Sequence, residues 1–155
     1  METETVRQPI GRVTGLFMHR RGCLEQLTEK TVISPEEIAW HPIFYQLELN
    51  PTPGDENLII DLIYDGLSPI RLDDMRRGTN VPYGALLWMD WFEIPPYDEM
   101  HDLDGRIVHP RAPGIHTVQI RTGRRKWAQM GRGRDFSPEN GGSTSEVYRI
   151  CIGEA

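Results

Sequence analysis

Three histidines and two aspartates gathered in 16 residues are the first group in this chain whose chemistry suggests an active site. They are His101, His109 and His116, with Asp102 and Asp104. Imidazole and carboxylate groups bind metals such as zinc and transfer protons near neutral pH. No pair of histidines has the short spacing usual among zinc ligands. A small metal-dependent hydrolase is therefore an alternative hypothesis and not the leading one.

The acidic segment 98–105 matches a calcium-binding loop only in part. When its glycine is aligned with the turn glycine of such a loop, Asp102 and Asp104 fall at two ligand positions. Met100 and Arg111 then occupy the first and last ligand positions, where carboxylates are required. The chain also has no phosphate-binding glycine loop and no nucleophile elbow. We expect no cofactor and no metal.

A basic segment, residues 121–134, carries the features of a nucleic-acid contact. It holds six cations and no acid. Cations neutralise phosphates, and an aromatic ring stacks on an unpaired base. The net charge of −6 repels a polyanion at long range, so direct nucleic-acid binding is a second alternative. Another interpretation is that these arginines pair with the acidic half or protect a hairpin edge. The candidate residues are Arg121, Arg124, Arg125, Lys126, Trp127, Arg132 and Arg134.

The rest of the chain is strongly acidic. Residues 1–105 carry 8 Lys/Arg against 19 Asp/Glu, whereas residues 106–155 carry 9 against 4. This asymmetry indicates either solvated faces of opposite sign or a charged partner. Carboxylates fixed on a rigid sheet steer a basic protein toward them and can occupy phosphate subsites of its cleft. The candidate partner-binding residues are Asp73, Asp74, Asp90, Glu93, Asp98, Glu99, Asp102, Asp104 and Trp91.

Two tryptophans bear on the same question. Trp88 and Trp91 are three residues apart, a spacing that puts them on opposite faces of a strand. One of them can therefore lie outside the core, and an exposed aromatic among charges is typical of a protein-binding hot spot. The alternative is that both are buried between two layers.

The elements that must position these residues are mostly strands. Apolar residues recur with a period of two, and Pro- and Gly-rich segments separate the runs. The pattern predicts a mainly β fold, namely a single antiparallel β-sandwich-like domain over 1–155 with one or two short helices. We expect strands at 13–19, 43–49, 58–64, 85–94, 115–121 and 147–152, a weaker one at 124–130, and a long mobile loop at 131–145.

Helical signals are few. Ser34 followed by Pro35 and two acids predicts a helix start at 34–38. The segments 24–30 and 72–78 each suggest one or two helical turns.

The expected cellular location follows from the sequence signals for a membrane helix and for secretion, both of which are missing here. No apolar run approaches the roughly 20 residues of a membrane helix, and the N-terminus lacks the basic-then-apolar order of a signal peptide. Cys23 and Cys151 form no metal or redox motif. We expect a cytoplasmic protein with reduced thiols and no membrane contact.

The C-terminal half has an order of motifs seen elsewhere. Val81-Pro82 precedes a strand ending in the residues Trp-Phe-Glu-Ile-Pro (91–95); then come a Pro-Gly step into a strand (113–121), a basic loop and a closing Tyr-containing strand (146–152). Residues 80–152 thus resemble the competence protein J-like proteins, β-sandwich-like inhibitors of a DNA-entry nuclease. The resemblance implies a binding protein and carries over no site residue.

The leading hypothesis joins this resemblance to the acidic surface. It is a non-catalytic protein-binding module, namely an acidic inhibitor or immunity-type protein of bacterial or phage origin. Its partner is a protein with a basic surface, such as a nuclease or another nucleic-acid-acting enzyme.

Overall fold

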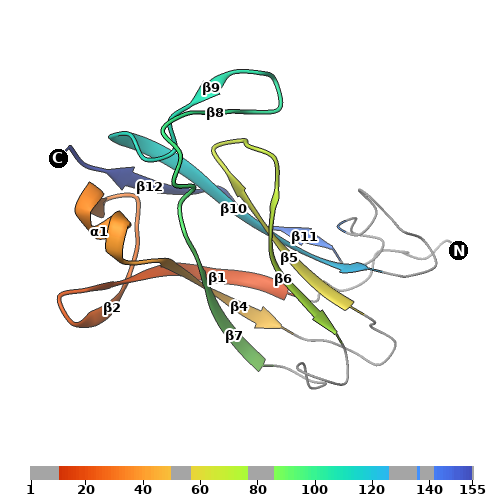
Figure 1. Cartoon of the computed structure of the whole chain (residues 1–155). Helices are drawn as coiled ribbons and strands as arrows, with labels where there is room; N and C mark the ends of the chain where they lie inside the picture. Colours follow the sequence, from red (N-terminus) through yellow and green to blue (C-terminus); the bar gives the residue numbers. More distant parts are fainter. Residues whose placement is uncertain (1–10, 50–56, 77–85, 126–135, 137–141, 155) are drawn as a thin grey trace, which may run out of the picture.

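The computed structural model describes residues 11–49, 57–76, 86–125, 136 and 142–154. They form a mainly β structure in which two sheets pack against each other (Figure 1). Sheet A has the order β2 (Cys23–Gln26), β1 (Gly11–Arg20), β4 (Ile43–Leu49) and β7 (Leu86–Phe92). Sheet B has the order β3 (Val32–Ile33), β12 (Tyr148–Ile152), β10 (Gly114–Arg125), β5 (Asn57–Tyr64) and β6 (Ile70–Arg76).

Four further elements complete the arrangement. The two-residue strand β11 (Ser143–Thr144) pairs with β10, and β8 (Met100–His101) pairs with β9 (Ile107–Val108) as a separate hairpin. The helix α1 (Pro35–Trp40) lies between β3 and β4 in the chain. The pairings are antiparallel except that β3 runs parallel to β12. No helix in the described ranges is long and apolar enough to cross a membrane.

The core lies between the two sheets and is supplied by alternate residues of their strands. Burial of such a side chain contributes about 1.5–3 kcal/mol to folding, and the outward-facing residues between them are free to be polar. The inward-facing residues of β4 and β5 are each no more than 1% exposed: Ile43, Tyr45, Leu47, Leu49, Leu58, Ile60, Leu62 and Tyr64.

The mainly β prediction is confirmed, and each of the six expected strands is present. The helix beginning at Ser34 is confirmed as well: its side chain accepts a hydrogen bond from the Glu37 backbone N–H. The weaker strand expected at 124–130 is described only as far as Arg125, where β10 ends. Of the loop expected at 131–145, residues 131–135 and 137–141 lie outside the described part, and β11 occupies 143–144.

Two helical predictions were wrong. Residues 24–26 belong to β2, which a two-residue turn joins to β1; Arg21 (φ 54°) and Gly22 (φ 81°) both take the positive φ that such a hairpin turn requires. Residues 72–76 belong to β6. An extra residue in β6 interrupts its alternation, so the charged run Arg-Leu-Asp-Asp imitates a polar helix face.

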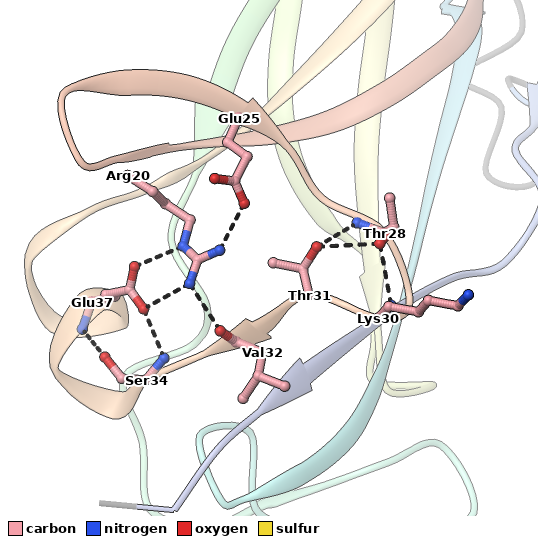
Figure 2. A network of polar contacts seen from close by, with 8 residues as sticks. All are labelled: Arg20, Glu25, Thr28, Lys30, Thr31, Val32, Ser34 and Glu37. Atoms are coloured by element: carbon pink, nitrogen blue, oxygen red, sulfur yellow. Dashed lines mark hydrogen bonds and ion pairs between the residues drawn. The ribbon is translucent and has the colours of Figure 1, made fainter.

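Arg20 ties α1 to the hairpin of β1 and β2 (Figure 2). Its guanidinium donates to Glu37 at 2.8 Å, to Glu25 at 2.7 Å and to the Val32 carbonyl at 3.0 Å. The hydrogen bond from Arg20 lowers the pKa of Glu37 below its ordinary value. Glu37 also accepts the Ser34 backbone N–H, so the helix cap and the ion pair share one carboxylate.

Loss of this cluster should be measurable. We expect Arg20→Ala to lower the free energy of unfolding by about 1–3 kcal/mol, because it leaves partly buried hydrogen-bond acceptors without a donor. Arg12→Ala is the matched control: the Arg12–Glu48 pair is exposed, and its loss should cost less than about 1 kcal/mol. Urea unfolding monitored by circular dichroism gives both values, and equal losses would contradict the assignment.

Candidate functional site

An extra residue in β6 decides where its charges point. Along β6 and β5, Asp73 lies opposite Ile60 and Arg71 lies opposite Asp61, so Leu72 has no partner of its own. Such a bulge puts two successive side chains on one face of the sheet. Arg71 therefore reaches Asp61, which lies on the face opposite to Ile60, while Asp73 turns toward the interior.

Asp73 belongs to a polar cluster between β6 and β7, the edge strands of the two sheets on one side of the sandwich; this side is called the open side below. The Tyr45 hydroxyl donates to Asp73 Oδ2 at 2.9 Å. Burial and a hydrogen bond with Asp90 of β7 raise the pKa of Asp73 to about 7, although the Tyr45 hydrogen bond lowers it. The buried indole N–H of Trp88 lies near enough to lower this pKa but forms no hydrogen bond of normal geometry. Near neutral pH the Asp73 carboxyl group is therefore partly protonated.

Next to this cluster is a groove of about 450 Å³ between β6 and β7, the outermost strands of the two sheets on that side (Figure 1). Asp90, Trp91 and Glu93 line it from the β7 side. Ile70, Arg71 and Leu72 line it from the β6 side, and Leu62 and Phe92 complete it. Two predicted partner-binding acids and the predicted tryptophan therefore share one concave surface.

The outer face of β7 is apolar. Leu87, Met89 and Trp91 are 65%, 40% and 51% exposed, whereas Trp88 packs against the core. The two tryptophans thus take opposite faces of the strand, as their spacing predicts. Trp91 lies at the junction of the apolar face and the acidic groove.

The remaining predicted acids lie elsewhere. Asp98, Glu99 and Asp104 are exposed beside β8 and β9. Asp102 shapes this hairpin: its carboxylate accepts the backbone N–H groups of Asp104 at 2.9 Å and Arg106 at 2.8 Å. Asp74 is on β6 opposite Ile59, and its side chain lies outside the described part of the chain.

The structure does not bring the histidines together. His116 is buried, with Nδ1 2.6 Å from Asp65 and Nε2 2.7 Å from the Ala112 carbonyl. His101 is exposed in β8, and Nδ1 of the exposed His109 lies 2.8 Å from the Asp98 carbonyl. Across the described residues, no three or more His, Cys, Asp or Glu side chains are placed to hold a metal ion. The hydrolase hypothesis gains no support from this geometry.

The His116–Asp65 pair fastens the end of β5 to β10. Burial lowers the pKa of His116, but hydrogen bonds to Asp65 and Ala112 outweigh burial and raise it above its ordinary value. Asp65 adopts a positive φ of 51° and also accepts the Thr117 backbone N–H at 2.8 Å. Both ring nitrogens are engaged, so this histidine is structural.

The basic segment is only partly described. Arg121 donates to Asp61 at 3.0 Å, and its guanidinium lies 3.8 Å from the centre of the Phe136 ring. Arg124 and Arg125 end β10, and their side chains are outside the described part. The other candidates lie outside the described residues altogether: Lys126, Trp127, Arg132 and Arg134.

Sequence reasoning missed three residues of this region: Tyr45, Asp61 and Arg71. Tyr45 lies within the strand expected at 43–49, among apolar residues, and a buried hydroxyl needs a hydrogen-bond partner. That requirement was the one available sign that a polar group lies opposite. Asp61 stands within an apolar run, where a charge normally requires pairing.

No protein-family model matches this chain, and no curated protein is significantly similar to it. The resemblance of residues 80–152 to the competence protein J-like proteins stays a prediction.

The proton held by Asp73 predicts a pH dependence. The folded-state pKa of about 7 exceeds the ordinary 3.8, so the folded protein binds an extra proton between these values. Stability therefore falls as pH rises from about 4 to about 7. We expect Asp73→Asn to remove this loss, a gain on the order of 1 kcal/mol at pH 8 after allowance for partial exposure. Urea unfolding across pH 4–8 measures it, with Asp104→Asn as the exposed control; parallel profiles for wild type and Asp73→Asn would refute the assignment.

The His116–Asp65 pair predicts a second pH dependence of stability, above pH 6.5. Because its folded-state pKa is raised above 6.5, its stabilisation is complete below pH 6.5 and is lost as pH rises through the folded-state value. We expect His116→Asn to cost about 2–4 kcal/mol at pH 6, since Asp65 loses its partner, and less at pH 9. The same titration of stability with His109→Asn as control tests this, and a cost independent of pH would argue against an imidazolium in the folded state.

Proposed function

We propose that this chain is a non-catalytic, acidic protein-binding module that inhibits a nucleic-acid-acting enzyme by occupying its basic surface, in the manner of an immunity protein. The observation that carries the proposal is the groove between β6 and β7, where Asp90 and Glu93 lie beside the exposed ring of Trp91. We place this encounter in the cytoplasm.

Three properties of the groove support protein binding. An exposed aromatic ring supplies contact area at a small entropic cost, and such rings dominate binding energy in many interfaces. The carboxylates Asp90 and Glu93 complement cations that otherwise contact phosphates. Both strands that line the groove belong to packed sheets, so the groups are held in place before the partner arrives.

The other predicted acids contribute differently. Asp98, Glu99 and Asp104 are exposed beside β8, which follows β7 in the chain, and they extend the negative potential that steers a basic protein. Asp73 is hydrogen-bonded to Asp90 and does not itself line the groove, so we assign it the support of Asp90 and not direct contact.

A capture experiment with variants tests the proposal. Immobilised wild type, Trp91→Ala and Glu93→Lys are exposed to lysate of the native host, and each retained basic protein is purified and assayed for nucleic-acid-directed activity. We expect wild type to inhibit it and Trp91→Ala to bind about 30-fold more weakly, which corresponds to a hot spot of about 2 kcal/mol. Glu93→Lys should slow association most at low salt.

Matched controls come from α1, where Trp40 and Glu36 are exposed. Trp40→Ala and Glu36→Lys should inhibit as well as wild type. A retained enzyme whose activity is unchanged by wild type would contradict inhibition. Equal inhibition by all five proteins would show that the groove is not the binding site.

A further inference from the structure

Among the strands that the structure describes, β7 is the sheet edge with the least protection. Proteins protect edge strands by shortness or charge, because an exposed edge pairs readily with another chain. β3 has two residues, β2 has four with Glu25 among them, and β6 carries four charged residues. β7 has seven residues, Asp90 is its only charge, and no described strand pairs with its outer side.

The backbone of β7 presents alternate residues to that outer side. The Trp91 N–H donates to the Asp90 side chain at 2.8 Å, so it does not point toward β4. Gln46 lies opposite Met89, and its carbonyl is turned toward β1, where the Thr14 hydroxyl donates to it at 3.3 Å. Because residues of an antiparallel pair alternate in direction, Leu87, Met89 and Trp91 direct their amide and carbonyl groups out of sheet A.

We infer that β7 binds an extended segment of the partner as an added strand, and that this segment carries Lys or Arg at alternate positions. The inference rests on the proposed function. In an added strand, one set of side chains continues the outer face beside Leu87 and Met89. The other set points to the groove, where Asp90 and Glu93 complement a cation.

A second copy of this chain fits the edge less well. β7 contains no lysine or arginine, so its own pairing across the edge brings no cation to Asp90. Charge complementarity therefore favours a basic segment of another protein.

A peptide probe tests strand addition directly. The probe is a capped eight-residue peptide of alternating Lys and Val, and its control carries N-methyl groups on the alternate amides that would pair with β7. By NMR, we expect the Lys–Val peptide to slow amide exchange of Leu87 and Met89 at least tenfold, and the N-methylated peptide to have no such effect. No slowing at millimolar peptide, or equal slowing by both peptides, overturns the inference.

A backbone variant supplies the second test. Met89→Pro removes an edge-facing N–H and leaves the hydrogen bonds to β4 intact; proline is tolerated at strand edges for this reason. Met89→Thr is the matched control that keeps the N–H. We expect Met89→Pro to weaken binding of the Lys–Val peptide at least tenfold, and equal binding by both variants contradicts strand addition. If Met89→Pro unfolds, as near-UV circular dichroism would show, the N-methylated peptide on wild type decides.

The two proposals can fail separately. If the Trp91→Ala variant no longer captures the enzyme but the Met89→Pro variant still does, the proposed function stands and strand addition is wrong. If neither variant affects capture, the proposed function itself is wrong.

Discussion

The unpaired Leu72 in β6 determines how charge is divided between the two faces of sheet B. Without that extra residue, Arg71 and Asp73 would lie on the same face, since they are two positions apart in a strand. The bulge instead leaves Arg71 with Asp61 and sends Asp73 to Tyr45 and the open side of the sandwich. This one backbone irregularity thus places the Asp73 carboxyl group beside Asp90, which lines the groove.

Part of the charge asymmetry of the sequence is neutralised inside the molecule. Arg121, from the basic C-terminal third, donates to Asp61, from the acidic part, and Asp61 is 3% exposed. This is the pairing of the two halves that the sequence left open as an alternative to nucleic-acid binding. Asp73 loses further charge by holding a proton. The negative potential offered to a partner therefore comes from fewer groups than the residue count suggests, chiefly Glu93 with the acids beside β8 and β9.

Regular periodicity made the central strands predictable, and local chemistry made the cap at Ser34 predictable. The edge strands β2 and β6 were not predictable, because β2 is defined by a turn at Arg21 and Gly22 and β6 by a bulge. For the candidate site, Asp90, Trp91 and Glu93 stand close together in sequence and were among the predicted partner-binding residues; the structure places them along one groove. The inward orientation of the Asp73 side chain could not be predicted, since it depends on the register of β6 against β5. The partner of His116 is 51 residues away, and such a contact leaves no local pattern.

Asp90 explains how β7 can have an exposed apolar edge without promoting aggregation of the protein. Its side chain covers the Trp91 N–H, which removes one donor from the edge. An apolar strand added to β7 would bury Asp90 without a cation, and burying an uncompensated carboxylate costs several kcal/mol. A strand with Lys or Arg facing the groove avoids that cost, because the cation replaces the water around Asp90. The same carboxylate therefore rejects unselective pairing and favours a basic segment, a discrimination that depends more on the cost of wrong partners than on the attraction of the right one.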